Sequence, residues 1–246
     1  MISFTRPLNP HPQTLLEGTL VELHNVAVSY AGHSGERLEV AGDLSFSLAK
    51  GEMVYLIGPT GSGKSTVLKL LYMDIKPDFG FVRVGHYQSD RIDDKDIPFL
   101  RRSLGVVFQD YQLLPDRSAF ENVAFALYAT GKRGRAVKER VMQVLARVGL
   151  SHKAHAKPHE MSGGEQQRAC IARAIVNEPV LLLADEPTGN LDPRVADEIQ
   201  KLLVKLHKEG MAVIMATHDY RVVKEFPART LALVKGRIVE VDPKTL

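Results

Sequence analysis

One glycine-rich stretch carries residue types that are suited to binding phosphate. It consists of Gly58, Pro59, Thr60, Gly61, Ser62, Gly63, Lys64, Ser65 and Thr66. The spacing of its glycines ahead of a Lys and a Ser fits the phosphate-loop pattern. Glycines let the backbone wrap closely around an anion, and the backbone N–H groups then point at its oxygens. We expect Lys64 to reach the outer phosphates of a nucleoside triphosphate and the Ser65 hydroxyl to help hold Mg²⁺.

Two consecutive carboxylates, Asp185 and Glu186, follow an apolar run that begins at Val180. This pattern predicts a buried parallel strand that ends at a ligand site. Asp185 would hold Mg²⁺ through water, and Glu186 would act as the general base that polarises the attacking water. The alternative is an acidic strand end without a function, which the phosphate loop in the same chain makes the weaker interpretation.

A second candidate anion site begins at Ser162. Ser162 and Glu165 form a capping box, which predicts the start of a helix. Gly163 and Gly164 occupy its first turn, although glycine lowers helix stability. Because they leave backbone N–H groups bare at the positive end of the helix, we interpret them as a second anion cradle.

Three further residues each have two interpretations. Gln109 follows a predicted strand over residues 105–108 and is either a solvated strand end or a contact to the metal and the attacking water. His218 follows a predicted buried strand over 211–216, at the place where α/β proteins bind ligands, although a lone His at a strand end is usually structural. Tyr30 either covers the core or stacks on a purine base, which would contribute on the order of 1 kcal/mol.

A metal site is a weak alternative for the histidines at 152, 155 and 159. No Cys or carboxylate cluster accompanies them, and Lys153 and Lys157 would repel a cation. The segment is better interpreted as a solvated loop.

The surrounding elements must hold these residues in place. The apolar run at 53–57 predicts a buried strand before the phosphate loop, and the apolar residues at 67–71 predict a helix after it. Alternation from residue 20 to 48, with a turn over 31–36, predicts an antiparallel region with one buried face. A second capping box at Ser118 and Glu121 starts a helix, and further helices follow over 137–148 and 195–206. A closing hairpin is predicted over 231–241.

Composition limits the class of protein. The chain has 246 residues and is 44% hydrophobic, which is enough for one sizeable domain with a subdomain. The formal net charge of +3 does not favour nucleic acid as a partner. A single cysteine excludes an intrachain disulfide and suits a reducing compartment. No apolar run approaches the roughly 20 residues that cross a bilayer, and no secretory signal is present. We therefore expect a cytoplasmic protein that does not insert into a membrane, with an extended tail over 1–19 and one domain over 20–246.

The motifs in their order resemble those of the ATP-binding cassette (ABC) ATPases over residues 20–241. They are the phosphate loop, Gln109, the signature at Ser162–Gln166, Asp185 and Glu186, Leu191 and Asp192, and His218. The resemblance implies an α/β fold with a RecA-like P-loop NTPase core, an antiparallel β subdomain and a helical subdomain at about 110–165. It also implies a head-to-tail homodimer that sandwiches two ATP molecules with Mg²⁺. Ser162, Gly163, Gly164 and Glu165 of one chain would then cover the ATP bound to Lys64 of the other, with Asp192 also at the nucleotide.

The resemblance assigns further roles. Tyr30 would stack on adenine, Gln109 would meet the metal, and His218 would contact the γ-phosphate. Small departures, such as Met161 in the signature and Asn190 in the turn before Asp192, remove no catalytic group, so we expect an active ATPase.

Within the family, residues 107–124, 161–168 and 185–192 are similar to the cell-division branch. Its members drive an FtsX-like integral membrane protein from the cytoplasmic face of the plasma membrane. ATPase subunits of lipoprotein-release and macrolide-efflux transporters share much of this pattern and stay open as an alternative. A cassette that acts on DNA or ribosomes is disfavoured, because the chain has no long coiled-coil insert and no second cassette.

Overall fold

The computed structural model describes residues 18–31 and 37–246, and the side chains of residues 31–40 are left out of the description. Residues 1–17 of the predicted tail therefore lie outside the described residues, and so do residues 32–36 of the predicted turn. None of the helices in the described part is long and apolar enough to cross a bilayer.

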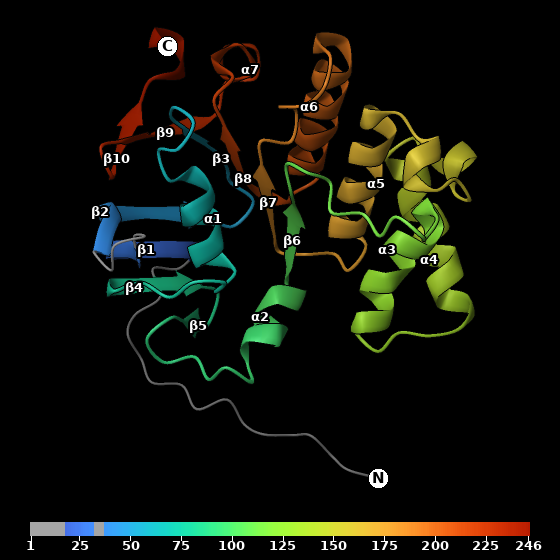
Figure 1. Ribbon diagram of the computed structural model, residues 1–246, viewed down its shortest axis with the longest axis horizontal. Helices are drawn as coiled ribbons and strands as arrows, with labels where there is room; N and C mark the ends of the chain where they lie inside the picture. The colour runs from blue at the N-terminus through green and yellow to red at the C-terminus, as the bar shows by residue number, and fades with distance from the viewer. Residues whose placement is uncertain (1–17, 32–36) are drawn as a thin grey trace.

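A six-stranded sheet forms the centre of the molecule, with strand order β10-β9-β3-β8-β7-β6 (Figure 1). Its strands are β3 (Met53–Ile57), β6 (Leu104–Val107), β7 (Leu181–Asp185), β8 (Ala212–Thr217), β9 (Arg229–Val234) and β10 (Arg237–Val241). Neighbours pair in parallel except for β9 and β10, which form the predicted antiparallel hairpin. The carboxyl ends of β3, β7 and β8 consequently lie next to one another at one edge of the sheet, where ligands bind in open α/β sheets.

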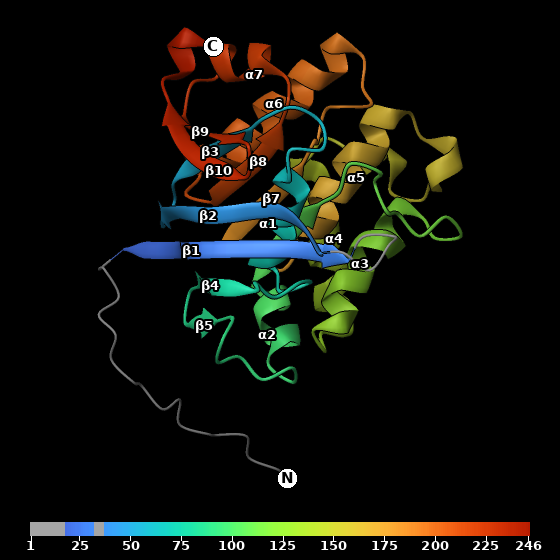
Figure 2. The same cartoon turned by 60° about the vertical axis from the view of Figure 1, so that its left-hand side comes forward.

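A second, antiparallel sheet has the order β2-β1-β4-β5. It consists of β1 (Thr19–Ala31), β2 (Arg37–Ala49), β4 (Phe79–Val84) and the short β5 (Tyr87–Gln88). The long β1–β2 pair contains several register shifts, which bend and twist a ribbon. It runs alongside the central sheet with α1 (Lys64–Leu71) beside it (Figure 2).

The helices fall into two groups. The first group comprises α1, α2 (Ile97–Arg102), α6 (Pro193–Lys208) and α7 (Tyr220–Glu225). The second group, here called the helical block, comprises α3 (Ala119–Ala129), α4 (Arg135–Arg147) and the 3₁₀ turns η1 (Ser151–Lys153) and η2 (Pro158–Glu160). Helix α5 (Gly163–Ile175) packs against α3 and α6, so it joins the helical block to the central sheet (Figure 1). A last 3₁₀ turn, η3 (Pro243–Thr245), ends the described chain.

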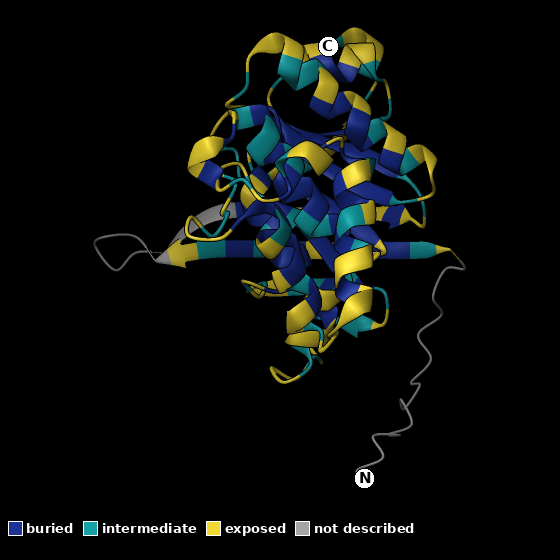
Figure 3. Ribbon diagram, turned by 90° about the vertical axis from the view of Figure 1, so that its right-hand side faces the viewer, coloured by how far each residue is buried: buried dark blue, intermediate teal, exposed yellow. Residues whose placement is uncertain are grey.

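Two hydrophobic cores lie on opposite faces of the central sheet. Alternate residues of β3 separate them: Tyr55 belongs to the core shared with the helical block, α5 and α6, and Leu56 belongs to the core shared with α1 and the antiparallel sheet. Because successive strand residues point to opposite faces, a continuously apolar strand fills both cores. Figure 3 shows the buried residues in the interior and the exposed ones on the outward faces of the helices.

The structure differs from the sequence-based expectations in a few places. Val180, predicted as the first residue of a buried strand, lies before β7 and is 52% exposed. Its backbone N–H donates to Ser103 O outside the sheet ladder, at 3.0 Å. Two short elements, β5 and α7, were not predicted, because two and six residues are too few to show a period.

Candidate functional site

The phosphate loop joins β3 to α1, as predicted. Gly63 has φ 102° and forms the N-cap of α1, so the chain enters the helix through a left-handed conformation that suits glycine. Thr60, Gly61, Gly63, Lys64, Ser65 and Thr66 line a cavity of about 230 Å³ together with Gln109, Glu186 and His218. The loop and three residues that lie far from it in sequence therefore meet at the edge of the sheet.

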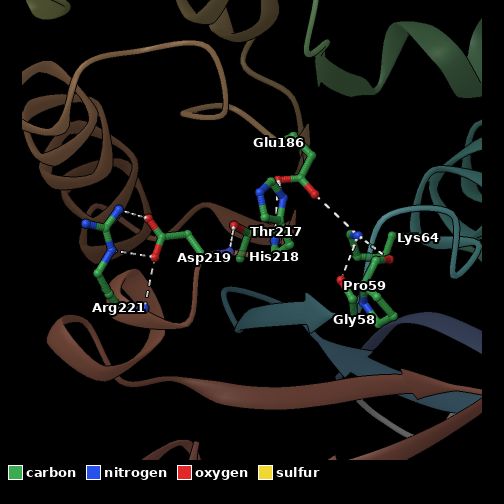
Figure 4. Close-up of polar contacts among 8 residues, drawn as sticks. All are labelled: Gly58, Pro59, Lys64, Glu186, Thr217, His218, Asp219 and Arg221. Atoms are coloured by element: carbon green, nitrogen blue, oxygen red, sulfur yellow. Dashed lines mark hydrogen bonds and ion pairs between the residues drawn. The ribbon is translucent and has the colours of Figure 1, made fainter.

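Lys64 is buried and points back along the loop (Figure 4). Its Nζ donates to Gly58 O at 2.9 Å and to Pro59 O at 3.1 Å. The same ammonium lies 3.3 Å from Glu186 Oε1. The buried amino group therefore has two backbone acceptors and a carboxylate as partners.

Glu186 stands one residue beyond β7 and has φ 45°, a conformation that non-glycine residues seldom adopt. Its backbone N–H donates to Ala216 O of β8 at 2.9 Å, which ties it to the neighbouring strand. Its Oε2 lies 2.8 Å from His218 Nδ1 and accepts from the backbone N–H of His218 at 3.4 Å. The Glu186 carboxylate is thus held between Lys64 and His218, as Figure 4 shows.

Asp185 faces a second, wider cleft. This cleft measures about 880 Å³, and Ser65, Gln109, Asp110, Asn190 and Asp185 contribute to its lining. Burial raises the pKa of the Asp185 carboxyl above its ordinary value, the Ser65 hydroxyl lowers it by hydrogen bonding, and the charge of Glu186 raises it. One Asp185 oxygen, Oδ1, is buried without a hydrogen-bond partner. A hydroxyl, an amide and a carboxylate with an unsatisfied oxygen form an oxygen donor set that fits Mg²⁺.

Gln109 lines both clefts, and its loop is held by residues that the sequence interpretation missed. Asn190 donates from Nδ2 to Gln109 O at 3.3 Å. Arg173 of α5 donates to Tyr111 O at 3.0 Å, and Cys170 Sγ donates to the same oxygen at 2.7 Å. These contacts join positions 59 to 81 residues apart, so no local sequence signal points to them.

Tyr30 lies near the end of β1, is 38% exposed and does not belong to either of the hydrophobic cores. Its hydroxyl is 3.4 Å from Thr66 Oγ1 in the first turn of α1. The structure therefore brings the ring beside the helix that begins at the phosphate loop, with one part of the side chain open to solvent.

Ser162 forms a capping box with Glu165 at the start of α5, as predicted. The Glu165 backbone N–H donates to Ser162 Oγ at 3.3 Å, and the Ser162 backbone N–H donates to Glu165 Oε2 at 2.8 Å. The second glycine has a packing role as well: a Cβ on Gly164 would lie 2.4 Å from Val195 Cγ1 of α6. Asp192 caps α6 by accepting from Arg194 N and Val195 N. These residues lie in α5 and at the start of α6, and the residues that line the two clefts come from other segments.

The histidines at 152, 155 and 159 do not form a metal site in the described part of the chain, where no cluster of three or more potential ligands occurs. His155 stacks on Phe120, and His152 lies beside Glu165. The segment that carries these histidines contains the 3₁₀ turns η1 and η2.

Comparison with known proteins identifies a family and several relatives of this chain. Residues 41–189 match the family model described as "ABC transporter". The chain is 48% identical over 201 residues to the cell division ATP-binding protein FtsE of Streptococcus pneumoniae, with 82% of this chain and 87% of the relative covered. It is 45% identical over 225 residues to the FtsE of Mycobacterium tuberculosis, with 92% and 96% covered.

A solved structure is also similar. It is the dimeric, post-hydrolysis form of the ATP-binding cassette MJ0796 bound to ADP and Pi. It has a TM-score of 0.82 and 34% sequence identity, and the match covers 92% of this chain and 99% of that chain.

Proposed function

Because the chain belongs to the ATP-binding cassette family and hydrolyses ATP, we propose that it is the nucleotide-binding subunit that drives an FtsX-like membrane protein in bacterial cell division. The observation that carries the proposal is the meeting of Lys64, Glu186 and His218 next to Asp185, in a chain that is 40–48% identical to several cell division ATP-binding proteins.

Nucleotide binding uses the loop and the residues around it. The backbone N–H groups of residues 58–66 and the Lys64 ammonium bind the β- and γ-phosphates. When Lys64 turns to the phosphates, it exchanges its contacts with Gly58 O and Pro59 O for contacts with anionic oxygens. The exposed part of the Tyr30 ring stacks on adenine.

The residues that would hold Mg²⁺ are Ser65, Gln109 and Asp185. The bound ion would neutralise charge on the β- and γ-phosphates. The buried, unsatisfied Asp185 Oδ1 supports this proposal, because a carboxylate oxygen at such a position needs a cation or a water molecule.

Hydrolysis requires a base that takes a proton from the attacking water. Glu186 has this role in the proposal, and its proton uptake accompanies formation of the bond between the water oxygen and the γ-phosphorus and cleavage of the bond to ADP. His218 holds the carboxylate through Nδ1 and also contacts the γ-phosphate from the end of β8. The ion pair with Lys64 would be released when nucleotide attracts the lysine.

A head-to-tail homodimer would complete the site. Ser162, Gly163, Gly164 and Glu165 lie in α5, outside the lining of the clefts, so they would meet nucleotide bound to a second copy. Asp192 would approach the same nucleotide. A dimeric cassette of 35% sequence identity supports this arrangement.

We further propose that the membrane partner docks near residues 109–121. Gln112 of this segment lines a groove between α2, α3 and α5, whose lining also includes Arg101, Arg102, Phe125 and Arg173. Phe125 is 55% exposed, and no carboxylate belongs to the lining of this groove in the described part of the chain. An apolar partner segment with acidic residues would fit it. This docking would hold the protein peripherally on the cytoplasmic face of the membrane, without insertion into the bilayer and without nucleic acid.

The proposed catalytic role of Glu186 has a direct test. Substitution of Glu186 by Gln removes the base and preserves the shape of the side chain, so ATP binding remains and turnover falls by about 10²-fold or more. Single-turnover hydrolysis of radiolabelled ATP measures the chemical step, and Lys64→Ala is the companion variant that loses ATP binding. Normal hydrolysis by Glu186→Gln would exclude Glu186 as the base.

The proposed partner is identified by affinity purification from detergent-solubilised membranes, with the Glu186→Gln chain and ATP. Recovery of a permease-like protein with an extracytoplasmic domain bound to cell-wall hydrolases is the expected result. A permease that carries lipoproteins or exports a drug would instead assign the chain to transport and leave the ATPase chemistry unchanged. Lys64→Ala controls for binding that does not depend on nucleotide.

A further inference from the structure

The signature helix carries a carboxylate at the end where an anion should bind. Glu165 is the third residue of α5, and its Oε2 accepts from the Ser162 N–H. This hydrogen bond holds the pKa of the Glu165 carboxyl below its ordinary value, so the group is negative at neutral pH. A negative charge in the first turn stabilises the isolated helix but repels a triphosphate that approaches the same N–H groups.

A histidine ring and a lysine ammonium face the other oxygen of this carboxylate. Glu165 Oε1 lies 3.5 Å from His152 Nε2 and 3.9 Å from Lys153 Nζ. The Lys153 ammonium also donates to Glu160 O at 3.2 Å, so it bridges η2 and the signature helix. The function derived above uses neither His152 nor Lys153.

The backbone of the turn that carries His152 and Lys153 is firmly held. Leu150 and Ala154, on either side of η1, are buried. Ala154 O accepts from Phe120 N at 2.8 Å, and Ala156 O accepts from Ala119 N at 2.9 Å, so the turn is bound to the start of α3. The backbone positions of His152 and Lys153 relative to Glu165 are therefore set by the packing of the helical block.

We propose that His152 and Lys153 are positioning residues for ATP binding between two copies of this chain. The Lys153 ammonium neutralises the Glu165 carboxylate and the His152 ring helps to hold it in place, so the N–H groups of Gly163 and Gly164 present a positive end to the triphosphate of the second copy. The proposal rests on the head-to-tail dimer proposed above. Each dimer contains the group of His152, Lys153 and Glu165 twice, so a modest effect at one site is doubled in the free energy of association.

The experiment measures ATP-driven dimerisation of the full-length Glu186→Gln chain by sedimentation velocity across an ATP titration with Mg²⁺. In this background we expect the double variant His152→Gln/Lys153→Met to raise the ATP concentration for half-dimerisation about tenfold, which corresponds to about 1.4 kcal/mol. Lys153→Arg keeps the charge and should stay within about twofold of the parent chain. Lys138→Met is the matched control, because it removes an exposed lysine from α4 in the same helical block.

Removing the Glu165 carboxylate distinguishes an electrostatic role of His152 and Lys153 from a merely structural one. Adding Glu165→Gln to the double variant should restore most of the lost dimerisation, because no negative charge then needs neutralising. If His152 and Lys153 only brace η1, the third substitution restores nothing, and the proposal is wrong. Unchanged dimerisation in the double variant also overturns it. If the Glu186→Gln chain itself stays monomeric at saturating ATP, the proposed dimer fails and this inference fails with it, whereas a dimerising parent leaves the two results distinct.

Discussion

Asp185 and Glu186 are neighbours in sequence but sit in different environments. Asp185 is the last residue of β7 and keeps one oxygen buried without a partner. Glu186 turns out of the strand with φ 45° and is bonded to Lys64 and His218. The change of backbone conformation between them points one carboxylate to the proposed metal site and the other to the proposed water site, so the proposal gives the two adjacent acids different tasks.

The buried Asp185 carboxylate should lower the stability of the nucleotide-free protein. Its pKa is raised, so the folded state disfavours the ionised form, and its contribution to the free energy of unfolding improves as pH falls toward the raised value. We expect Asp185→Asn to raise the melting temperature at pH 7 and the difference from the parent to shrink on acidification. Thermal melts between pH 7.5 and 5 measure this, with Mg²⁺-dependent turnover lost in the same variant. A less stable variant at pH 7 would contradict the desolvation argument.

Tyr30 provides a test of base stacking. We expect Tyr30→Ala to weaken ATP affinity by about five- to tenfold, since stacking contributes on the order of 1 kcal/mol. Tyr30→Phe retains the ring and loses only the hydroxyl contact with Thr66, so its affinity should stay within about twofold. Calorimetric titration with ATP compares the two variants, and equal losses in both would assign the effect to the hydroxyl.

At the scale of elements, the sequence correctly predicted the helix starts and strands that depend on interactions between near neighbours in the chain. The capping boxes at Ser118 and Ser162 are present with both of their reciprocal hydrogen bonds. Strand β3 occupies the predicted residues, because a continuous apolar run between turn residues has few alternatives. The candidate site residues were accessible to sequence reasoning because each ends a strand or begins a helix. The loop after Gln109 was not, since Arg173 and Cys170 reach it from a helix distant in sequence.

The contact between α5 and α6 predicts that the effect of Gly164→Ala on stability depends on the side chain at Val195. Ala is favoured over Gly in a helix by about 0.8–1.0 kcal/mol, but overpacking costs typically about 1–3 kcal/mol. A Cβ on Gly164 would lie 2.4 Å from the stiff, β-branched Val195. Gly164→Ala should therefore lower the free energy of unfolding in the parent and raise it in a Val195→Ala chain. Urea unfolding of the four chains measures the cycle, and the same sign in both backgrounds would exclude the steric explanation.

At the scale of the whole molecule, the central sheet separates two close-packed cores. Close-packed interiors are hard to compress, so a displacement at one side is passed on to the other side. We therefore expect ATP bound at the edge of the sheet to move α5 and the helical block as a unit. The groove between α2, α3 and α5 lies where such a movement would be felt by a bound partner.

The docking proposal is tested by reversing a charge in the groove. Arg102 lies over the Phe99 ring, 5.0 Å from its centroid, and lines the groove. Arg102→Glu should reduce recovery of the membrane partner at least about tenfold, because like charges would then face each other. ATP turnover of the isolated chain should stay within twofold. Lys208→Glu makes the same charge change at the far end of α6 and should leave recovery unchanged. Equal loss in both variants would indicate a general charge effect.

Cys170 has a practical consequence for measuring the movement between two copies. It is the single cysteine of the chain and is fully buried, and burial raises the pKa of its thiol to about 12. Thiol reagents attack the thiolate, so the native protein should resist maleimide dyes and spin labels while it is folded. One cysteine introduced on an exposed face, such as at Lys138, would then be the unique point of labelling. Paired labels across a dimer would report its closure spectroscopically, without first removing a residue from the core.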